Sequence, residues 1–214
     1  MDNELFKRIV SSLILLPVSM YIIIYDNLIF KLFLVICLIV SLYEWLSMKK
    51  NQLFNFSGLF FLLFTFILAY KLRYDFNENY TYFLITILVC VFTDIGGYIF
   101  GKIFKGPKLT KISPNKTYSG MIGGFLLSIL AIQILLDLKF LNIDINLSIS
   151  NIFFIFFVSL SSQIGDICIS YFKRKSKIKD TGKLIPGHGG LLDRIDGIIF
   201  AIPTAYFIIL NNLI

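Results

Sequence analysis

The sequence predicts a polytopic helical membrane protein, an all-α transmembrane bundle of about seven spans in a single integral membrane domain. Of the 214 residues, 57% are hydrophobic and only 15% are charged, whereas about 25% of the residues of an ordinary soluble domain are charged. Apolar runs long enough to cross a hydrocarbon core of about 30 Å recur along the chain. The runs are continuous rather than alternating, which argues against a transmembrane β-barrel.

The predicted spans cover residues 9–25, 28–47, 54–70, 80–101, 120–141, 150–172 and 195–213. Only Asp26 and Asn27 separate the first two spans, which therefore form a tight hairpin. Lys7 and Arg8 precede the first apolar run as in a signal peptide, but no small-residue cleavage site follows it and further spans come after. We therefore predict that this run is a retained helix.

Basic residues are distributed unevenly between the two ends of these spans. With the N-terminus in the cytoplasm, sixteen of the twenty Lys and Arg residues lie on the cytoplasmic side, and only Lys31, Lys71, Arg73 and Lys139 lie outside. This asymmetry follows the positive-inside rule and agrees with an odd number of spans. The net charge of +7 thus marks the cytoplasmic face. Anionic lipid headgroups and nucleotides are the expected partners there, and nucleic acid is not.

Two predicted cytoplasmic loops, residues 102–119 and 173–194, are too rich in Gly, Pro and Lys to be buried helix. The second loop gathers basic residues, aspartates and the only histidine of the chain between two apolar runs. A membrane protein keeps such a polar loop beside the bilayer where something charged binds. Lysines, arginines and spaced aspartates together suit a phosphate-rich ligand that carries a divalent metal.

Small residues four apart occur on either side of the first loop. Gly97 with Gly101, and Gly120 with Gly124, are predicted to be helix-packing faces. The nearest approach to a Walker A loop, Gly101 to Lys108, lacks the Lys followed by Ser or Thr that such a loop requires.

Acids inside apolar spans are costly and are usually functional. Glu44, Asp94 and Asp166 lie toward the cytoplasmic ends of their spans, and Asp193 and Asp196 begin the last span with a spacing that puts both on one helix face. The four aspartates could converge at one depth, where a divalent cation would offset their repulsion. Oxygen ligands without Cys or His favour Mg²⁺ over zinc. Alternatively, Asp166 bonds a neighbouring helix and Asp94 pairs with a lysine, and the role of Glu44 stays open.

The basic residues of the second loop divide into two kinds. The guanidinium groups of Arg174 and Arg194 suit bidentate phosphate binding. Lys175, Lys177 and Lys183 are expected to be a solvated run beside lipid headgroups.

The turn Pro186–Gly190 exposes a bare backbone that can approach a ligand closely. Its successive N–H groups could hold phosphate oxygens, helped by the dipole of the helix that follows. His188 could act as a general base, but holding the turn or touching a phosphate is the favoured interpretation. Lys179 and Asp180, in a polar turn, could be structural or functional.

The second loop resembles the signature of a known family. Positions 170–196 read Ser-x-x-Lys-Arg-x4-Lys-Asp-x-Gly-x2-Ile-Pro-Gly-His-Gly-Gly-Leu-x-Asp-Arg-Ile-Asp, a pattern similar to that of phosphatidate cytidylyltransferases, also called CDP-diglyceride synthetases. Three shorter blocks also fit: Asp94-Ile-Gly-Gly-Tyr98 with Gly101, Ser113-Pro-x-Lys-Thr117, and Gln163-Ile-Gly-Asp166. The resemblance covers roughly residues 90–200, and the N-terminal spans match only in hydrophobicity and Glu44.

The sequence departs from the family pattern at several positions. The family usually reads Ser-Pro-Lys-Lys-Thr-Trp-Glu-Gly in the first loop, where this chain has Asn115, Tyr118 and Ser119. Ile169 stands where a glutamate is common and Gly197 where a serine is common. The departures bear on rate or substrate preference more than on reaction type.

The resemblance implies a membrane-bound nucleotidyltransferase of phospholipid biosynthesis that makes CDP-diacylglycerol and pyrophosphate from CTP and phosphatidate. It places residues 1–80 in N-terminal spans and residues 81–214 in the catalytic part. It also implies a homodimer in the bacterial cytoplasmic (inner) membrane, with the active site facing the cytoplasm. Catalysis of this kind is mainly positioning and charge neutralisation.

The resemblance also implies a set of site residues. The metal would be Mg²⁺, with a monovalent cation such as K⁺ as a further candidate, and the implied metal ligands are Asp166, Asp193 and Asp196. The implied catalytic residues are Asp166, Asp193, Asp196, Lys173, Arg174, Lys179, Asp180, His188 and Arg194. The implied substrate-binding residues are Ser113, Lys116, Thr117, Asp94, Gly187, Gly189 and Gly190.

Several alternative functions can be compared with the sequence. A polyprenol kinase disagrees with the string His-Gly-Gly-x-x-Asp-Arg-x-Asp, whereas a cytidylyltransferase for ether lipids does not. A transporter that uses Asp94 and Asp166 as an ion relay predicts acids near the midplane and symmetric halves. The predicted acids lie near one face and no repeat is visible. A non-catalytic homologue is the remaining alternative.

Overall fold

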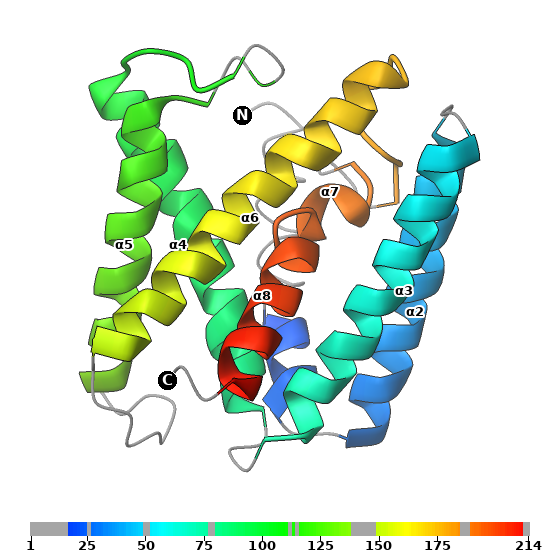
Figure 1. Cartoon of the computed structure of the whole chain (residues 1–214), viewed down its shortest axis with the longest axis horizontal. Coiled ribbons are helices and arrows are strands. Elements are labelled where there is room, and N and C mark those ends of the chain that lie inside the picture. The colour runs from blue at the N-terminus through cyan, green and yellow to red at the C-terminus, as the bar shows by residue number, and fades with distance from the viewer. Residues whose placement is uncertain are drawn as a thin grey trace. The chain divides into compact units, whose positions relative to one another are not determined.

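The structure, a computed structural model, describes residues 17–24, 27–48, 52–76, 80–110, 113, 116–137, 149–184 and 189–211. Its helices are α2 (Asn27–Ser47), α3 (Gln52–Tyr74), α4 (Thr81–Phe104), α5 (Tyr118–Asp137), α6 (Ile149–Lys175), α7 (Leu192–Ile195) and α8 (Ile198–Leu210) (Figure 1). Residues 17–24 are also helical. The described part of the chain is therefore all-helical, which confirms the predicted fold class.

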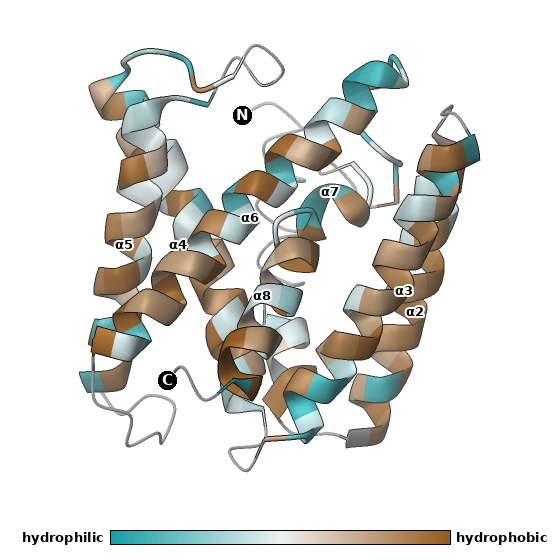
Figure 2. Ribbon diagram, in the orientation of Figure 1, coloured by the Kyte–Doolittle hydropathy of each residue, from teal (hydrophilic) through white to brown (hydrophobic). Residues whose placement is uncertain are grey.

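Helices α2 to α6 are each long and apolar enough to cross a membrane, with 20 to 27 residues and mean hydropathies of 1.9 to 2.1. At 1.5 Å per residue, the shortest of them spans about 30 Å, the thickness of the hydrocarbon core. Figure 2 shows their largely hydrophobic ribbons. Large apolar side chains such as Leu53 and Phe60 are exposed on the helix surfaces. Lipid tails accommodate such side chains, so this is an integral membrane protein.

Five of the seven predicted spans correspond to α2 to α6, with α3 longer than predicted at both ends. The first predicted span, residues 9–25, lies mostly outside the described residues. The last, residues 195–213, begins differently, because α7 ends at Ile195 and the 13-residue helix α8 begins only at Ile198. The backbone N–H of Gly197 donates to the Asp196 side chain at 2.9 Å, a local bond that competes with helix formation. The count of seven spans stays a prediction.

The chain forms two compact units, each described by itself. Unit 1 consists of residues Met1–Tyr70 and Phe172–Ile195, and unit 2 consists of Lys71–Tyr171 and Asp196–Ile214. Unit 1 thus contains α2, most of α3, the end of α6, and α7. Unit 2 contains α4, α5, most of α6, and α8. The predicted boundary at residue 80 stays a prediction.

In unit 2, α4 and α5 pack backbone to backbone through glycines. A Cβ atom at Gly120 would lie 2.6 Å from the carbonyl oxygen of Gly97, and one at Gly124 would lie 2.9 Å from that of Thr93. Small residues permit this close approach between membrane helices. The prediction that these glycines form helix-packing faces is confirmed.

Hydroxyl groups join other helix pairs of unit 2. The Thr93 and Ser159 hydroxyls, on α4 and α6, lie 2.7 Å apart, and those of Ser161 and Thr204, on α6 and α8, lie 2.8 Å apart. Hydrogen bonds of this kind hold helices together where hydrophobic burial gives no advantage over lipid. They fix α6 beside α4, which positions the polar residues described below.

In unit 1, an aromatic cluster ties the α2–α3 hairpin to the end of α6. Trp45 is 3% exposed, and its indole N–H donates to the Asn55 carbonyl oxygen at 3.2 Å. The Phe172 ring meets those of Trp45 and Phe54 edge-on, with centroids 5.1 and 5.6 Å away. Edge-to-face pairs contribute about 0.5–1.5 kcal/mol each beyond burial. The cluster anchors the point from which the signature sequence departs.

Neighbouring glycines of α4 provide a matched test of the α4–α5 packing. A Cβ atom at Gly96 would lie 2.5 Å from the Gly123 carbonyl oxygen, whereas one at Gly97 would find its nearest neighbour at 3.7 Å. We expect Gly96→Ala to destabilise the protein by about 1–3 kcal/mol, the usual cost of overpacking. Gly97→Ala should be neutral or slightly stabilising, because alanine favours helix. Thermal unfolding in detergent measures both variants, and equal melting temperatures would contradict the backbone contact.

Candidate active site

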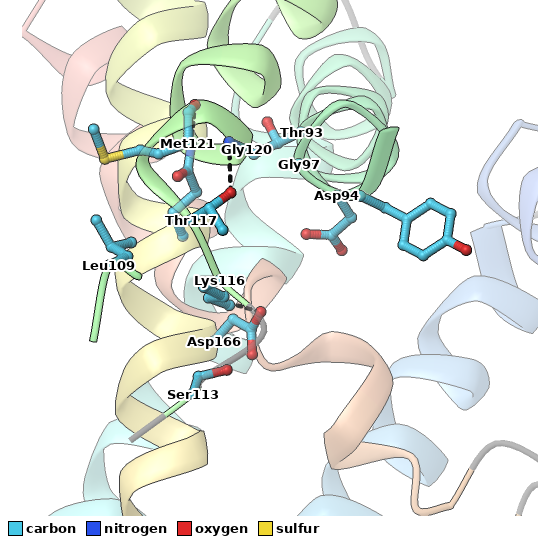
Figure 3. A pocket seen from close by; sticks show the side chains of 12 residues that line it. Thr93, Asp94, Gly97, Leu109, Ser113, Lys116, Thr117, Gly120, Met121 and Asp166 are labelled. Atoms are coloured by element: carbon cyan, nitrogen blue, oxygen red, sulfur yellow. Dashed lines mark hydrogen bonds and ion pairs between the residues drawn. The ribbon is translucent and has the colours of Figure 1, made fainter. Parts of the chain in front are cut away.

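Unit 2 contains a pocket of about 300 Å³ lined by α4, α5, α6 and the loop between α4 and α5 (Figure 3). This volume is at the lower end of the range typical of small-molecule sites. Eight of the twelve lining residues have polar or charged side chains: Thr93, Asp94, Tyr98, Ser113, Lys116, Thr117, Gln163 and Asp166. An apolar membrane protein places such groups together for a polar ligand.

The described ends of the α4–α5 loop (residues 105–117), residues 105–110 and 116–117, run antiparallel as the two arms of a narrow hairpin. Lys105 and Gly106 turn the chain with positive φ angles of 51° and 97°. The Leu109 N–H then donates to the Lys116 carbonyl oxygen at 2.8 Å, and the Tyr118 N–H donates to that of Pro107 at 3.2 Å. These bonds bring Lys116 back to the pocket.

Lys116 forms an ion pair with Asp166, on α6. The side chains are 25% and 30% exposed, so both charged groups remain accessible from the pocket. Asp166 also accepts a long hydrogen bond from the Ser170 hydroxyl at 3.4 Å. Asp94 reaches the same pocket from α4, and Figure 3 shows its carboxylate and that of Asp166 directed toward the same space. The structure thus brings together two predicted acids and one predicted phosphate-binding lysine.

The hydroxyl residues of the loop have local partners as well. Thr117 caps α5, because its hydroxyl oxygen accepts the Gly120 N–H at 3.1 Å, as Ncap residues do. The same hydroxyl lies 3.0 Å from that of Ser119. Ser113 lines the pocket, and its N–H donates to the Thr110 hydroxyl at 3.1 Å. Thr117 therefore shapes the pocket wall in addition to its predicted contact with substrate.

Unit 1 holds a second polar cluster, centred on Asp193. Its Oδ1 accepts from the Lys173 ammonium at 2.8 Å, and its Oδ2 accepts from the Thr181 N–H at 2.7 Å, the Thr181 hydroxyl at 3.0 Å and the Gly190 N–H at 3.0 Å. The Lys173 and Asp193 side chains are only 11% and 6% exposed. Burial alone would raise the pKa of the Asp193 carboxyl, but bonds from Lys173, Thr181 and Gly190 outweigh burial and hold that pKa below its usual range.

Glu44 joins the same cluster from α2. It is 2% exposed, and its carboxylate accepts from the Leu191 N–H at 2.9 Å, the Leu192 N–H at 2.8 Å and the Thr181 hydroxyl at 2.9 Å. Sequence reasoning left the role of Glu44 open. The available signal was an acid in an apolar span, but its partners lie 137 to 148 residues further along the chain.

The other predicted residues of this region lie at the surface. Arg174, Lys179, Asp180 and Arg194 are exposed, and the Arg174 guanidinium donates to the Ile178 carbonyl oxygen at 3.3 Å. Lys175, Lys177 and Lys183 are also exposed, as predicted.

The predicted glycine turn is described only in part. Gly187 and His188 lie outside the described residues. Gly189 has a φ of 86°, which favours glycine. Gly190 is buried, and its N–H donates to Asp193. The bare backbone at Gly190 therefore approaches a carboxylate of the protein itself.

The predicted four-aspartate site is divided between the two units: Asp94, Asp166 and Asp196 belong to unit 2 and Asp193 belongs to unit 1. α7 includes Asp193 but ends before Asp196, so one helix does not carry both. Among the described residues, no group of three or more His, Cys, Asp or Glu side chains could hold a metal ion. The convergence of the four aspartates stays a prediction.

Comparison with known proteins identifies the family. The profile of the cytidylyltransferase family matches residues 6–75 and 54–211, almost the whole chain. The chain belongs to the cytidylyltransferase family. This membership confirms the resemblance found in the signature sequence of residues 170–196.

Individual relatives within the cytidylyltransferase family agree. The chain is 36% identical to the phosphatidate cytidylyltransferase of Rickettsia bellii (strain RML369-C), over 96% of this chain and 91% of that protein. It is 34% identical to that of Rickettsia felis (strain ATCC VR-1525 / URRWXCal2), over 96% of this chain and 92% of that protein. It is 39% identical to that of Staphylococcus epidermidis (strain ATCC 35984 / DSM 28319 / BCRC 17069 / CCUG 31568 / BM 3577 / RP62A), over 64% of this chain and 52% of that protein.

Proposed function

We propose that this protein is a membrane-bound phosphatidate cytidylyltransferase, which transfers the cytidylyl group of CTP to phosphatidate and releases pyrophosphate. The observation that carries the proposal is similarity over nearly the full length to relatives of that name. The polar pocket of unit 2 supports it, since an enzyme for a charged nucleotide needs such a site within apolar helices.

The reaction forms a bond between a phosphate oxygen of phosphatidate and the α-phosphorus of CTP. The bond from that phosphorus to the oxygen bridging to the β-phosphate breaks, and pyrophosphate leaves with the electron pair. Because the attacking phosphate is already anionic, it needs no general base. Catalysis of this kind consists of positioning and neutralising negative charge. We assign phosphate binding to Lys116, whose ammonium can exchange Asp166 for a phosphate oxygen, and to the Ser113 and Thr117 hydroxyls.

The pocket suits a magnesium ion. Mg²⁺ is usually bound by one or two carboxylates together with substrate phosphates and water, and the pocket offers the carboxylates of Asp94 and Asp166. When bound, Mg²⁺ would neutralise charge on the triphosphate. Lys116 also offsets the negative charge of Asp166. The predicted K⁺ ion and homodimer rest on the family resemblance and remain predictions.

The cations of the signature sequence contribute to phosphate binding in this proposal. Arg174, Lys179 and Arg194 are exposed. Lys173 differs, because it is buried against Asp193. We therefore assign Lys173 and Asp193 first to holding the loop, and the exposed cations to the substrate.

We propose that the active site faces the cytoplasm of a bacterial inner membrane. The last turn of α6 carries Lys173, Arg174 and Lys175, and basic residues flank membrane helices on the cytoplasmic side. That placement gives the site access both to water-soluble CTP and to phosphatidate anchored in the inner leaflet.

A reconstitution assay tests the proposal. Purified protein in phosphatidate vesicles with labelled CTP and Mg²⁺ is expected to give a labelled liponucleotide. EDTA should stop the reaction, and excess Mg²⁺ should restore it. Vesicles of a neutral phospholipid serve as the control. A transporter would give no labelled lipid in any of these mixtures, and that result would contradict the proposal.

A further inference from the structure

Glu44 is a charged residue in an apolar helix, and the reaction proposed above does not use it. It lies one turn from the end of α2 and is 2% exposed. A buried carboxylate is costly unless hydrogen bonds replace its lost hydration. The buried carboxylate therefore needs hydrogen-bond donors, and the identity of these donors indicates the role of Glu44.

The hydrogen-bond donors to the Glu44 carboxylate lie in the signature region. Oε1 accepts from the Leu191 N–H, and Oε2 accepts from the Leu192 N–H and the Thr181 hydroxyl, at 2.8 to 2.9 Å. These donors lie at both ends of the segment 181–192. We define the signature loop as residues 176–191, and a single carboxylate thus joins Thr181, within this loop, to Leu191 at its end and to Leu192 of α7. Hydrogen bonds to charged acceptors are shorter and stronger than neutral ones.

Two glycines of the signature loop are fitted to this carboxylate. A Cβ atom at Gly182 would lie 2.6 Å from Glu44 Oε1, and one at Gly190 would lie 2.5 Å from Oε2. Any larger residue would displace the acid or the loop. The bare backbone at these positions therefore accommodates Glu44.

The contacts extend from Glu44 to the ion pair of Asp193. The Thr181 hydroxyl lies 2.9 Å from Glu44 Oε2 and 3.0 Å from Asp193 Oδ2, and Lys173 bonds the other oxygen of Asp193. A network of Glu44, Thr181, Asp193 and Lys173 results, which crosses from α2 to the end of α6. The one Thr181 hydroxyl proton is shared between the two carboxylates, and buried networks of this kind hold a single arrangement of the backbone.

We infer that Glu44 is a positioning residue: its carboxylate holds the described residues of the signature loop and α7 in the one arrangement in which the exposed Lys179 can bind a phosphate of CTP. Glu44 itself touches no substrate. The inference deepens the proposed function and rests on it for the identity of the ligand. The arrangement of the loop itself can be tested without turnover.

Glu44→Gln is the informative variant, because it preserves the size of the side chain and replaces one acceptor oxygen with an NH₂ group that faces N–H or O–H donors. Hydrogen–deuterium exchange measured by mass spectrometry is expected to be at least about tenfold faster in peptides spanning residues 181–195. Peptides of the α4–α5 loop, residues 105–117, should be unchanged. In turnover, KM for CTP should rise about tenfold or more, while KM for phosphatidate stays within about twofold.

Ser41→Ala is the matched control. Ser41 lies one turn earlier on α2, is fully buried, and donates its hydroxyl to the Cys37 carbonyl oxygen of its own helix at 2.6 Å. This variant should leave exchange in the loop and both KM values at wild-type levels. If Glu44→Gln fails to fold, Gly182→Ala perturbs the same contact from the loop side and should accelerate the same exchange.

The outcomes separate this inference from the proposed function. Unchanged exchange in residues 181–195 of both Glu44→Gln and Gly182→Ala would overturn the positioning role. A rise in both KM values together would also overturn it, because the loop would then not act through CTP. Faster exchange in a protein whose wild type makes no liponucleotide would support the role of Glu44 in holding the loop and contradict only the proposed reaction.

Discussion

Asp166→Asn is expected to lower cytidylyl transfer by about a hundredfold or more. Asp166 lines the polar pocket, bears an accessible carboxylate, and is the residue to which Lys116 is paired. Asparagine keeps the shape but removes the charge that would bind Mg²⁺ and orient the lysine. Loss of a single group that stabilises transition-state charge typically costs a factor of about 10²–10³. Initial rates with saturating CTP, phosphatidate and Mg²⁺ measure the effect.

Two variants control this experiment. Asp137→Asn changes an exposed aspartate at the end of α5, and its rate should equal that of the wild type. Lys116→Met should also be strongly impaired, whereas Lys108→Met, which changes an exposed lysine of the same loop, should have little effect. A fully active Asp166→Asn protein would remove this pocket from the mechanism.

Lys173→Met is expected to destabilise the protein by about 3–5 kcal/mol, the usual cost of leaving one member of a buried ion pair without its partner. The Lys173 and Asp193 side chains are 11% and 6% exposed, so water cannot replace the lost ammonium. The double variant Lys173→Met with Asp193→Asn should recover part of this loss, since neighbouring effects of this kind are not additive. Thermal unfolding in detergent of the wild type, the single variant and the double variant measures both changes in stability.

Lys173→Met also separates a structural from a catalytic role. Below its lowered melting temperature, the variant should retain measurable turnover if Lys173 acts by holding Asp193. An unchanged melting temperature combined with complete loss of turnover would instead mean that Lys173 acts on the substrate, as the family resemblance alone implied.

The sequence predicted the helices that consist of one continuous apolar run. α2 and α4 to α6 begin and end within a few residues of the predicted spans, because about 20 apolar residues admit no other structure in lipid. The last span was predicted wrongly as one helix from residue 195. Its interruption depends on the bond from Gly197 to the Asp196 side chain and on contact between Gly197 and Ser162, where a Cβ atom would lie 2.4 Å from the hydroxyl. The contact between Gly197 and Ser162 is long-range, so the hydropathy of the sequence could not predict it.

The sequence predicted which types of residue the candidate site contains better than it predicted which of these residues contact one another. The predicted phosphate ligand Lys116 lies beside the predicted metal ligand Asp166, a contact between segments about 50 residues apart. Asp193, also a predicted metal ligand, accepts four hydrogen bonds from protein groups. The sequence predicts Glu44 as an acid in an apolar span that matches the family, but it does not predict its partners, because a sequence does not show which distant donors meet a buried charge. Gly190 was predicted to approach a ligand, which stays a prediction; in the structure its backbone approaches Glu44 and Asp193.

The position of the label in CTP tests the central claim most directly. Parallel reactions contain phosphatidate, Mg²⁺ and CTP labelled either at the α- or at the γ-phosphate. Cytidylyl transfer predicts that the α-label enters the lipid fraction in step with product, while the γ-label leaves as pyrophosphate. Transfer of the γ-label to lipid would show that the protein is a kinase, and absence of both labels from lipid would show that it does not carry out this reaction at all.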